Sequence, residues 1–168
     1  TLHTVTIQDD DNPLGFLQAI NGELHGSEDG TAWGRIDVSS IFGANNVNGI
    51  GWGNNTWTIG GGSGKSAYSS DGLTWSAITL PTGVSDEVME IEYFRGVWYF
   101  VTDKNILMTS NFTNWNISAS SPNSMEAQYG PIAIGPDKIV VMDVFTAVEA
   151  TPSSNYASVN FSIVSSLT

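Results

Sequence analysis

The sequence predicts an all-β fold, a propeller-like array of about four four-stranded antiparallel blades. One reason is a repeat: Trp33, Trp75 and Trp115 recur with a period of about 40 residues, which is typical of one four-stranded blade per repeat. The second reason is that short runs of alternating apolar and polar residues, bounded by Asn, Gly and Asp, fill each repeat. Such runs indicate strands joined by hairpin turns.

The repeat is carried by a turn in which a hydroxyl residue is followed by Asp or Asn and then by a tryptophan. The three copies are Ser27, Asp29, Gly30 and Trp33; Ser69, Asp71, Gly72 and Trp75; and Thr109, Asn111 and Trp115. In the second copy Gly72 accepts the positive φ of a tight turn, and the Ser69 hydroxyl or the Asp71 carboxylate can bond to turn amides. Trp75 covers the turn with its ring. We therefore predict a structural corner between the third and fourth strands of a blade.

The repeats divide a single domain, residues 1–168, into four units with approximate bounds 1–44, 45–83, 84–124 and 125–168. In the second and third units we expect strands over 49–52, 56–59, 66–69 and 75–78, and over 89–94, 97–101, 106–108 and 115–117. The first unit has strands over 14–20 and 23–25, with a leading or outer strand over 4–7. The fourth lacks the corner and has strands over 131–134, 139–142 and 157–164, with a loop over 151–156. Whether the units close into a ring within one chain stays open.

Composition restricts the classes of partner. The 168-residue chain has 17 acidic and 5 basic residues, which give a formal net charge of -12. This charge repels the phosphates of nucleic acids and of anionic membranes, so we expect neither as a partner. The chain has no cysteine for a disulfide and no apolar stretch long enough for membrane insertion, and we expect no cofactor. Because the chain starts without Met, we expect a processed product or a fragment.

The second copy of the turn resembles the Asp-box, or BNR repeat, of sialidases and other propeller proteins, whose consensus is Ser-x-Asp-x-Gly-x-Thr-Trp. Ser69, Asp71, Thr74 and Trp75 match the consensus, while Gly72 lies one residue earlier than the consensus glycine. The first copy keeps most of these residue types, and the third keeps the fewest. The resemblance implies that the boxes are structural and lie at the blade periphery, away from any active site.

The resemblance also bears on activity. Sialidases grip the substrate carboxylate with three arginines, whereas this chain contains only Arg35 and Arg95. Lysine does not replace the bidentate geometry of arginine. We therefore expect a sialidase-like fold without the sialidase catalytic residues, and no enzymatic activity.

Two acidic groups suggest other chemistry, but each has a simpler interpretation. Glu90 and Glu92, two apart on a strand, are compatible with a carboxylate-based glycosidase, but charges there also protect a solvated strand edge. Asp9, Asp10 and Asp11 offer oxygen ligands for Ca²⁺. A solvated acidic turn is the favoured interpretation of these three residues, and no metal is expected.

The candidate ligand-binding residues are aromatic: Trp52, Trp57, Trp98 and Tyr99, which lie on first and second strands outside the corners. Aromatic rings bind sugars by stacking, and nearby Asn and Asp side chains then bond to the hydroxyl groups. Packing between neighbouring blades requires large apolar residues at the same positions, and this is the favoured interpretation.

The leading functional hypothesis is a non-enzymatic binding or structural module exposed on a virion, such as a bacteriophage tail-fibre, decoration or receptor-binding component. It rests on the acidity, the Gly, Asn, Ser and Thr content and the lack of a catalytic constellation, which is an argument by analogy. The expected partners are other virion proteins or a host-surface glycan, at the virion surface or in an extracellular setting, with homo-oligomerisation left open. The alternatives are a carbohydrate-binding module of a secreted bacterial protein and, last, a glycosidase.

Overall fold

The computed structural model describes residues 14–118, 132–135, 138–142, 146–150 and 162–166 of the chain. The described strands form four antiparallel sheets in which each strand pairs with its neighbour in the sequence. Blade 1 has three strands, β1 (Phe16–Ile20), β2 (Glu23–Ser27) and β3 (Gly34–Ile36). A one-turn helix, α1 (Ser39–Phe42), leads from blade 1 to blade 2. The predicted strand over residues 4–7 lies outside the described residues.

Blades 2, 3 and 4 have four strands each. Blade 2 consists of β4 (Val47–Gly53), β5 (Thr56–Gly61), β6 (Ser66–Ser69) and β7 (Ser76–Ile78), with a short 3₁₀ turn, η1 (Gly62–Gly64), between β5 and β6. Blade 3 consists of β8 (Val88–Phe94), β9 (Val97–Thr102), β10 (Ile106–Thr109) and β11 (Asn116–Ile117). Blade 4 consists of β12 (Ile132–Ile134), β13 (Ile139–Met142), β14 (Thr146–Ala150) and β15 (Ser162–Ser166).

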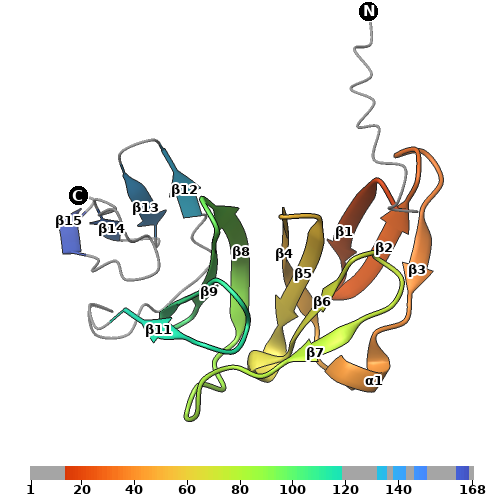
Figure 1. Ribbon diagram of the computed structural model, residues 1–168, viewed down its shortest axis with the longest axis horizontal. Helices are drawn as coiled ribbons and strands as arrows, with labels where there is room; N and C mark the ends of the chain where they lie inside the picture. Colours follow the sequence, from red (N-terminus) through yellow and green to blue (C-terminus); the bar gives the residue numbers. More distant parts are fainter. Residues whose placement is uncertain (1–13, 119–131, 136–137, 143–145, 151–161, 167–168) are drawn as a thin grey trace, which may run out of the picture.

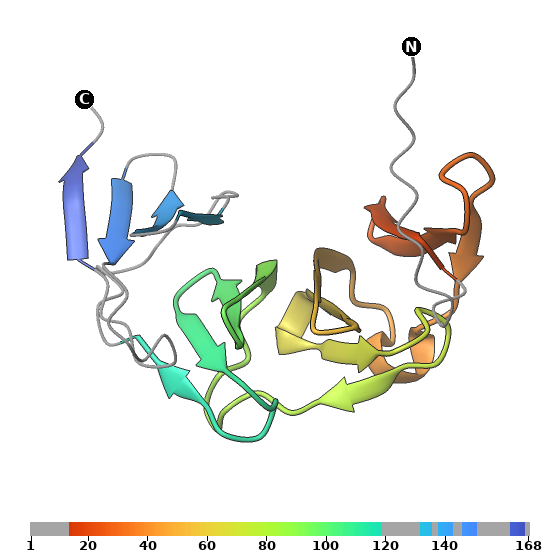
Figure 2. The same cartoon turned by 45° about the horizontal axis from the view of Figure 1, so that its top comes forward.

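The blades follow one another along an arc, as Figures 1 and 2 show. The first strands, β4 and β8, lie on the concave side of the arc, and the last strands, β7 and β11, lie on the convex side (Figure 2). Blades 1 and 4 stand at opposite ends of the arc. The predicted all-β array of four-stranded blades is confirmed. Neither helix of the described residues is long and apolar enough to cross a membrane.

Blade 4 differs in detail from the expectation. The first two strands lie where the sequence indicates, but β14 was not expected. Of the expected last strand over 157–164, residues 162–164 belong to β15 (Ser162–Ser166), and residues 157–161 lie outside the described residues. Residues 151–161, which include the expected loop, lie outside the described residues. β14 pairs with both β13 and β15, so it supplies the third position of the sheet that the other blades fill with β6 and β10.

The second corner, between β6 and β7, shows how the repeated turn is held. The Ser69 hydroxyl accepts hydrogen bonds from the backbone N–H groups of Asp71 and Gly72, at 3.2 and 2.8 Å, and donates one to Asp71 Oδ1 at 2.8 Å. Asp71 Oδ1 also accepts the N–H groups of Leu73 and Thr74, at 2.8 and 2.7 Å. The Trp75 indole then donates to the Gly72 carbonyl at 3.1 Å. Hydroxyl, carboxylate and indole thus satisfy most of the turn backbone.

The first and third corners repeat this network with substitutions. In the first, Gly30 N–H donates to Ser27 Oγ at 2.8 Å, and the Trp33 indole donates to the Gly30 carbonyl at 3.1 Å. In the third, Asn111 Oδ1 accepts the N–H groups of Thr113 and Asn114, at 3.0 and 2.8 Å, as a carboxylate would. The three corners therefore occupy equivalent positions in blades 1, 2 and 3.

The positions of the corners show which strands of blade 1 correspond to which strands of blades 2 and 3. The corner follows β2 in blade 1 but follows the third strands, β6 and β10, in blades 2 and 3. β1 therefore corresponds to the second strands, β5 and β9. Among the described residues, blade 1 has no counterpart of β4 and β8.

Each pair of neighbouring blades shares a cluster of buried apolar side chains. Between blades 1 and 2 the cluster includes Leu24, Phe42 and Ile59, and between blades 3 and 4 it includes Tyr99 and Ile139. The cluster between blades 2 and 3 contains mostly residues of blade 3: Val88, Ile91, Trp98, Phe100 and Leu107, with Ile78 from blade 2. This asymmetry arises because blade 2 presents glycines on that side.

Glycine lets the backbone of blade 2 approach blade 3 closely. A Cβ atom on Gly53 of β4 would lie 2.2 Å from the ring of Tyr93, and one on Gly60 of β5 would lie 2.5 Å from Val88. Real Cβ atoms do not approach other atoms so closely, so any side chain at these positions forces the blades apart. The large side chains of β8 fill the space that the glycines leave.

We predict that Gly53→Ala lowers the free energy of unfolding by about 1–3 kcal/mol, because the added methyl group overpacks the contact with Tyr93. Urea denaturation of the purified chain measures this change. Gly34→Ala is the matched control, since a Cβ at Gly34 meets nothing within 4 Å. Its effect is expected to stay within about 0.5 kcal/mol. Equal losses from both substitutions would contradict the close-approach explanation.

The Asp71 carboxylate adds a pH-dependent contribution to stability. Hydrogen bonds from the backbone N–H groups of Thr74 and Leu73 lower the pKa of Asp71 from 3.8 to about 2 in the folded chain. Because the folded pKa is depressed, the ionised carboxylate stabilises the fold above pH 3.8, and this contribution is lost as the pH falls towards about 2. An amide at this position would bond to the same N–H groups without titrating, as Asn111 does in the third corner.

We therefore predict that Asp71→Asn is less stable than the wild type at about pH 6 and that this difference shrinks as the pH approaches about 2. Comparing the two proteins at each pH cancels the titration of their other carboxylates. Denaturation curves across this range measure the difference. A stability difference that does not change with pH would contradict the role given to the ionised carboxylate.

Candidate functional site

A groove of about 530 Å³ opens between the outer parts of blades 2 and 3. Tyr68 on β6, the end of β7 and the connection that follows β7 form one wall, and the third corner forms the other. Its apolar and aromatic lining residues are Tyr68, Ala77, Ile78, Leu80, Pro81, Phe112 and Trp115, and its polar ones are Thr79, Thr82, Asn111 and Thr113. Pockets that bind small ligands or single side chains have this size and this mixture of surfaces.

Stacked aromatic rings hold the two walls together. The rings of Tyr68 and Phe112 lie 5.3 Å apart between centroids and nearly parallel, at 18°. Phe112 also contacts Trp98 at 5.5 Å and Phe100 at 6.5 Å, and Trp115 meets Phe100 edge-on at 5.2 Å. Tyr68 is nevertheless 39% exposed, so part of its ring faces solvent. The groove thus has a rigid floor and an accessible aromatic wall.

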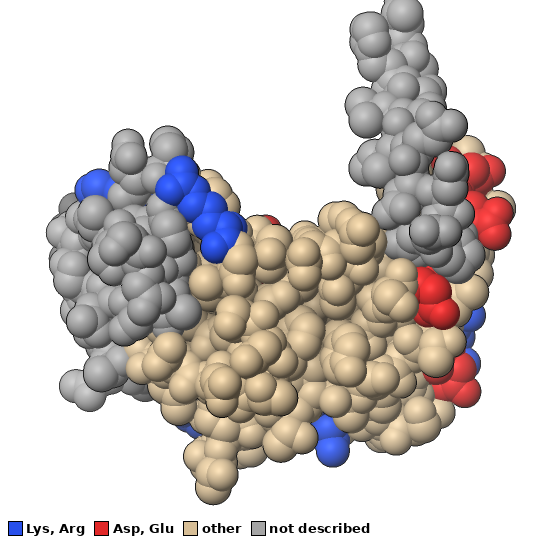
Figure 3. Space-filling view, in the orientation of Figure 1, with Lys and Arg blue, Asp and Glu red and all other residues tan. Residues whose placement is uncertain are grey.

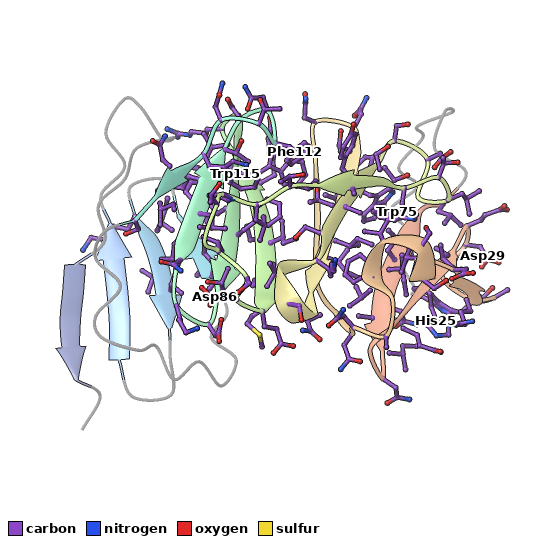
Figure 4. All side chains as sticks on the ribbon, turned by 90° about the horizontal axis from the view of Figure 1, so that it is seen from below. His25, Asp29, Trp75, Asp86, Phe112 and Trp115 are labelled. Carbon is purple, nitrogen blue, oxygen red and sulfur yellow. The ribbon has the colours of Figure 1, made fainter. Side chains whose placement is uncertain are left out.

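Phe112 occupies a position that is glycine in the other two corners. Its φ is +59°, close to the +76° of Gly30 and the +73° of Gly72. A bulky residue in this left-handed conformation costs about 1–2 kcal/mol. The ring stack with Tyr68, Trp98 and Phe100 offsets that cost. Figure 4 shows Phe112 on the side of blade 3 that faces blade 2, with Trp115 close by.

Trp115 differs from the other corner tryptophans. Trp33 and Trp75 donate their indole N–H groups to the carbonyl of the corner glycine. In the described part of the chain, the Trp115 N–H has no hydrogen-bond partner and is buried. The third corner has therefore exchanged one hydrogen bond of the repeated turn for aromatic packing beside the groove.

The groove is uncharged, although the chain as a whole is strongly acidic. None of its lining residues carries a charge. Figure 3 shows the face over β7 and the third corner as predominantly uncharged, with acidic residues gathered on the side of blade 1. The amide oxygen of Asn111 already accepts two backbone N–H groups, so this side chain offers mainly its N–H₂ group to a ligand. The groove therefore suits an uncharged group, which it can contact through both its aromatic rings and its threonine hydroxyls.

The structure separates the four predicted aromatic residues into two pairs. Trp98 and Tyr99 are 3% and 0% exposed, so they belong to the core and have no free ring face for a ligand. Trp52 is 39% exposed, and its ring lies 4.6 Å from that of Trp57, its partner across β4 and β5. Only the pair of Trp52 and Trp57 therefore offers a surface on which a ligand could stack.

The acidic residues of blade 3 lie elsewhere. Glu90 and Glu92 share one face of β8, the inner edge of the sheet, and burial raises the pKa of both. The Glu92 carboxylate raises the pKa of Glu90 further. Asp86 bonds to the ammonium group of Lys104 at 2.7 Å and to the Asn105 amide at 2.9 Å. Figure 4 shows Asp86 away from Phe112 and Trp115, and none of these three acidic residues lines the groove.

The described residues contain no group of three or more His, Cys, Asp or Glu side chains placed to hold a metal ion. Asp9, Asp10 and Asp11, the predicted alternative for Ca²⁺, lie outside the described residues. A second pocket, of about 280 Å³, lies between blade 1 and α1. Its charged residues are already engaged: Arg35 pairs with Glu23 at 3.1 Å, and Asp37 accepts the Ser39 N–H at 2.9 Å. These pairings suit a structural role for that pocket.

Solved structures share the architecture. The chain is similar to a structure described as YCF48 bound to D1 peptide, with a TM-score of 0.63, 17% identity, and coverage of 85% of this chain and 47% of that chain. It is also similar to YCF48 from Cyanidioschyzon merolae, with a TM-score of 0.67, 13% identity, and coverage of 88% and 51%. The chain thus spans about half the length of each. No protein-family model and no curated protein matches the sequence. At these identities the likeness shows the fold alone, which is that of a β-propeller.

Proposed function

We propose that the chain is a non-catalytic binding module that recognises a neutral, apolar part of a protein partner in the groove between blades 2 and 3. The observation that carries this proposal is the uncharged aromatic groove itself, in a chain whose formal charge is -12. Rigid, partly exposed aromatic rings such as Tyr68 are the residues that most often supply binding energy at protein interfaces. A charged ligand group would lose its hydration there without gaining a counter-charge.

One further observation supports a protein ligand in the groove: one of the similar propeller structures is described as bound to a peptide. This observation is an analogy between folds, because the two sequences are only 17% identical.

The proposal that the chain is not an enzyme rests on which potential catalytic residues it contains. The two arginines of the sequence cannot form the triad of a sialidase. Glu90 and Glu92 lie on β8, the inner edge of blade 3, where burial raises the pKa of both carboxyl groups. We also propose that the three corners are Asp-boxes in the structural sense, since each holds its turn through the same hydroxyl and Asp or Asn oxygens.

The setting that we propose for this module is the surface of a virion, for example on a bacteriophage tail fibre or as a receptor-binding component. Its support is the composition: strong acidity, no cysteine, and many Gly, Asn, Ser and Thr residues. Mass spectrometry of purified virions from the source of the gene is expected to detect the chain. Its consistent absence from intact particles would remove the virion setting and leave the binding module intact.

A second candidate ligand is a glycan that stacks on Trp52. The observation that favours it is the exposed ring of Trp52, which is 39% accessible and supported by Trp57 at 4.6 Å. A glycan array probed with the wild type and with Trp52→Ala tests this candidate. Loss of a glycan signal in the variant supports stacking at Trp52, whereas signals unchanged by the substitution contradict it.

Peptides that bind the full wild-type chain can be selected from a random displayed library. We predict that these peptides bind the Tyr68→Ala variant at least about tenfold more weakly than they bind the wild type. Truncating Tyr68 removes the exposed wall of the groove, although the deeper Phe112 remains. Leu73→Ala is the control, because Leu73 is 52% exposed and does not line the groove. Thermal unfolding of both variants checks that the fold is retained. Peptide affinities equal in wild type and Tyr68→Ala would contradict the groove as the binding site.

A further inference from the structure

The convex side of blade 2 ends in an edge strand. In the described part of the chain, β7 pairs only with β6, in the register Ser66 to Ile78, Ala67 to Ala77 and Tyr68 to Ser76. Figure 2 shows β7 on the outer side of the arc. An edge strand has backbone N–H and C=O groups along its far side that can pair with another strand. The side chains of Ser76 and Ala77 are exposed, so they do not cover this edge.

β7 lacks the charge that protects the corresponding edge of blade 1. The equivalent strand β3 carries Arg35, whose side chain is 58% exposed and pairs with Glu23. Charged side chains on edge strands commonly prevent pairing with other chains. The sequence of β7 is Ser76-Ala77-Ile78. Although β7 is only three residues long, it has neither the charge nor the proline that commonly blocks strand addition.

The groove runs beside this same edge. Ala77 and Ile78 of β7 line it, and so do the residues that follow, Thr79 and Leu80. Successive side chains of a strand point to opposite faces of the sheet. A strand added to β7 would therefore direct every second side chain towards the face on which Tyr68 and the third corner lie.

We propose that an extended segment of the protein partner pairs with β7 as a fifth strand of blade 2 and inserts an uncharged apolar side chain into the groove beside Tyr68. This proposal rests on the proposed function, because it specifies how that ligand binds. Backbone hydrogen bonds to β7 supply affinity that does not depend on sequence, and the groove selects the inserted side chain. The segment carries uncharged residues at alternate positions, because the groove offers no counter-charge.

The test uses peptides about ten residues long, the upper length of ordinary strands, selected from a random displayed library on the full chain. For each selected peptide, a series of variants is synthesised, and each variant carries one backbone N-methyl group at a different position. Alternate N–H groups of a strand point to opposite edges, so methylation at every second position removes a hydrogen bond to β7. We expect about tenfold or greater weakening at alternate positions and little change between them, together with about tenfold weakening by Tyr68→Ala.

The possible results are distinguishable. Binding that needs Tyr68 but shows no alternating effect of N-methylation overturns strand addition and leaves the proposed function standing. If N-methylation at alternate positions weakens binding but Tyr68→Ala does not, the added strand lies on another edge, which overturns the inference for β7 and the groove as the binding site. A failure to select any peptide that distinguishes the wild type from Tyr68→Ala overturns both proposals. Leu73→Ala again serves as the control, because Leu73 lies in a corner outside the groove.

Discussion

The close contact between β4 and β8 is the constraint on which the rest of the arrangement depends. Gly49, Gly51 and Gly53 alternate along the face of β4 that meets blade 3, and a Cβ on Gly49 would lie only 3.1 Å from the backbone of Glu90. Because these positions have no side chains, Ile91 of β8 packs directly on the β4 backbone and is fully buried. The inner ends of the two blades are thus sealed by backbone contact. At the outer ends, the ring of Tyr68 on β6 lies between the two blades and stacks on Phe112, and the groove opens there.

The corners show that the repeated turn depends on geometry more than on charge. In the second corner a single carboxylate oxygen of Asp71 accepts two backbone N–H groups, and the amide oxygen of Asn111 does the same in the third. Ser and Thr hydroxyls are equally interchangeable at the first position, since Thr109 accepts the Phe112 N–H at 2.9 Å. The backbone network therefore tolerates neutral substitutes at these two positions.

The sequence predicted the features that depend on local chemistry. The spacing of the tryptophans located the corners of blades 1, 2 and 3, because hydroxyl, Asp or Asn, and Trp act within one turn. Alternation did not reveal which faces are buried: Tyr99 reads as a possible ligand platform, but every residue of β9 is covered by blades on both sides. The sequence did not predict the groove, because the groove depends on contact between Tyr68 and Phe112, which are distant in sequence. One signal was available, since Phe112 stands where the other corners have Gly30 and Gly72.

The two faces of blade 2 have a consequence for how such chains can grow by tandem duplication. One face of β4 presents glycines, and the other presents Val47, Ile50 and Trp52, which correspond to Val88, Ile91 and Tyr93 on the face of β8 that meets those glycines. A second copy of blade 2 inserted beside the first would therefore find a complementary surface already made. A second copy of blade 3 would not, because Glu90 and Glu92 would meet bulky apolar side chains. Within this chain, blade 2 is a self-compatible module, and blade 3 is specialised for its two neighbours.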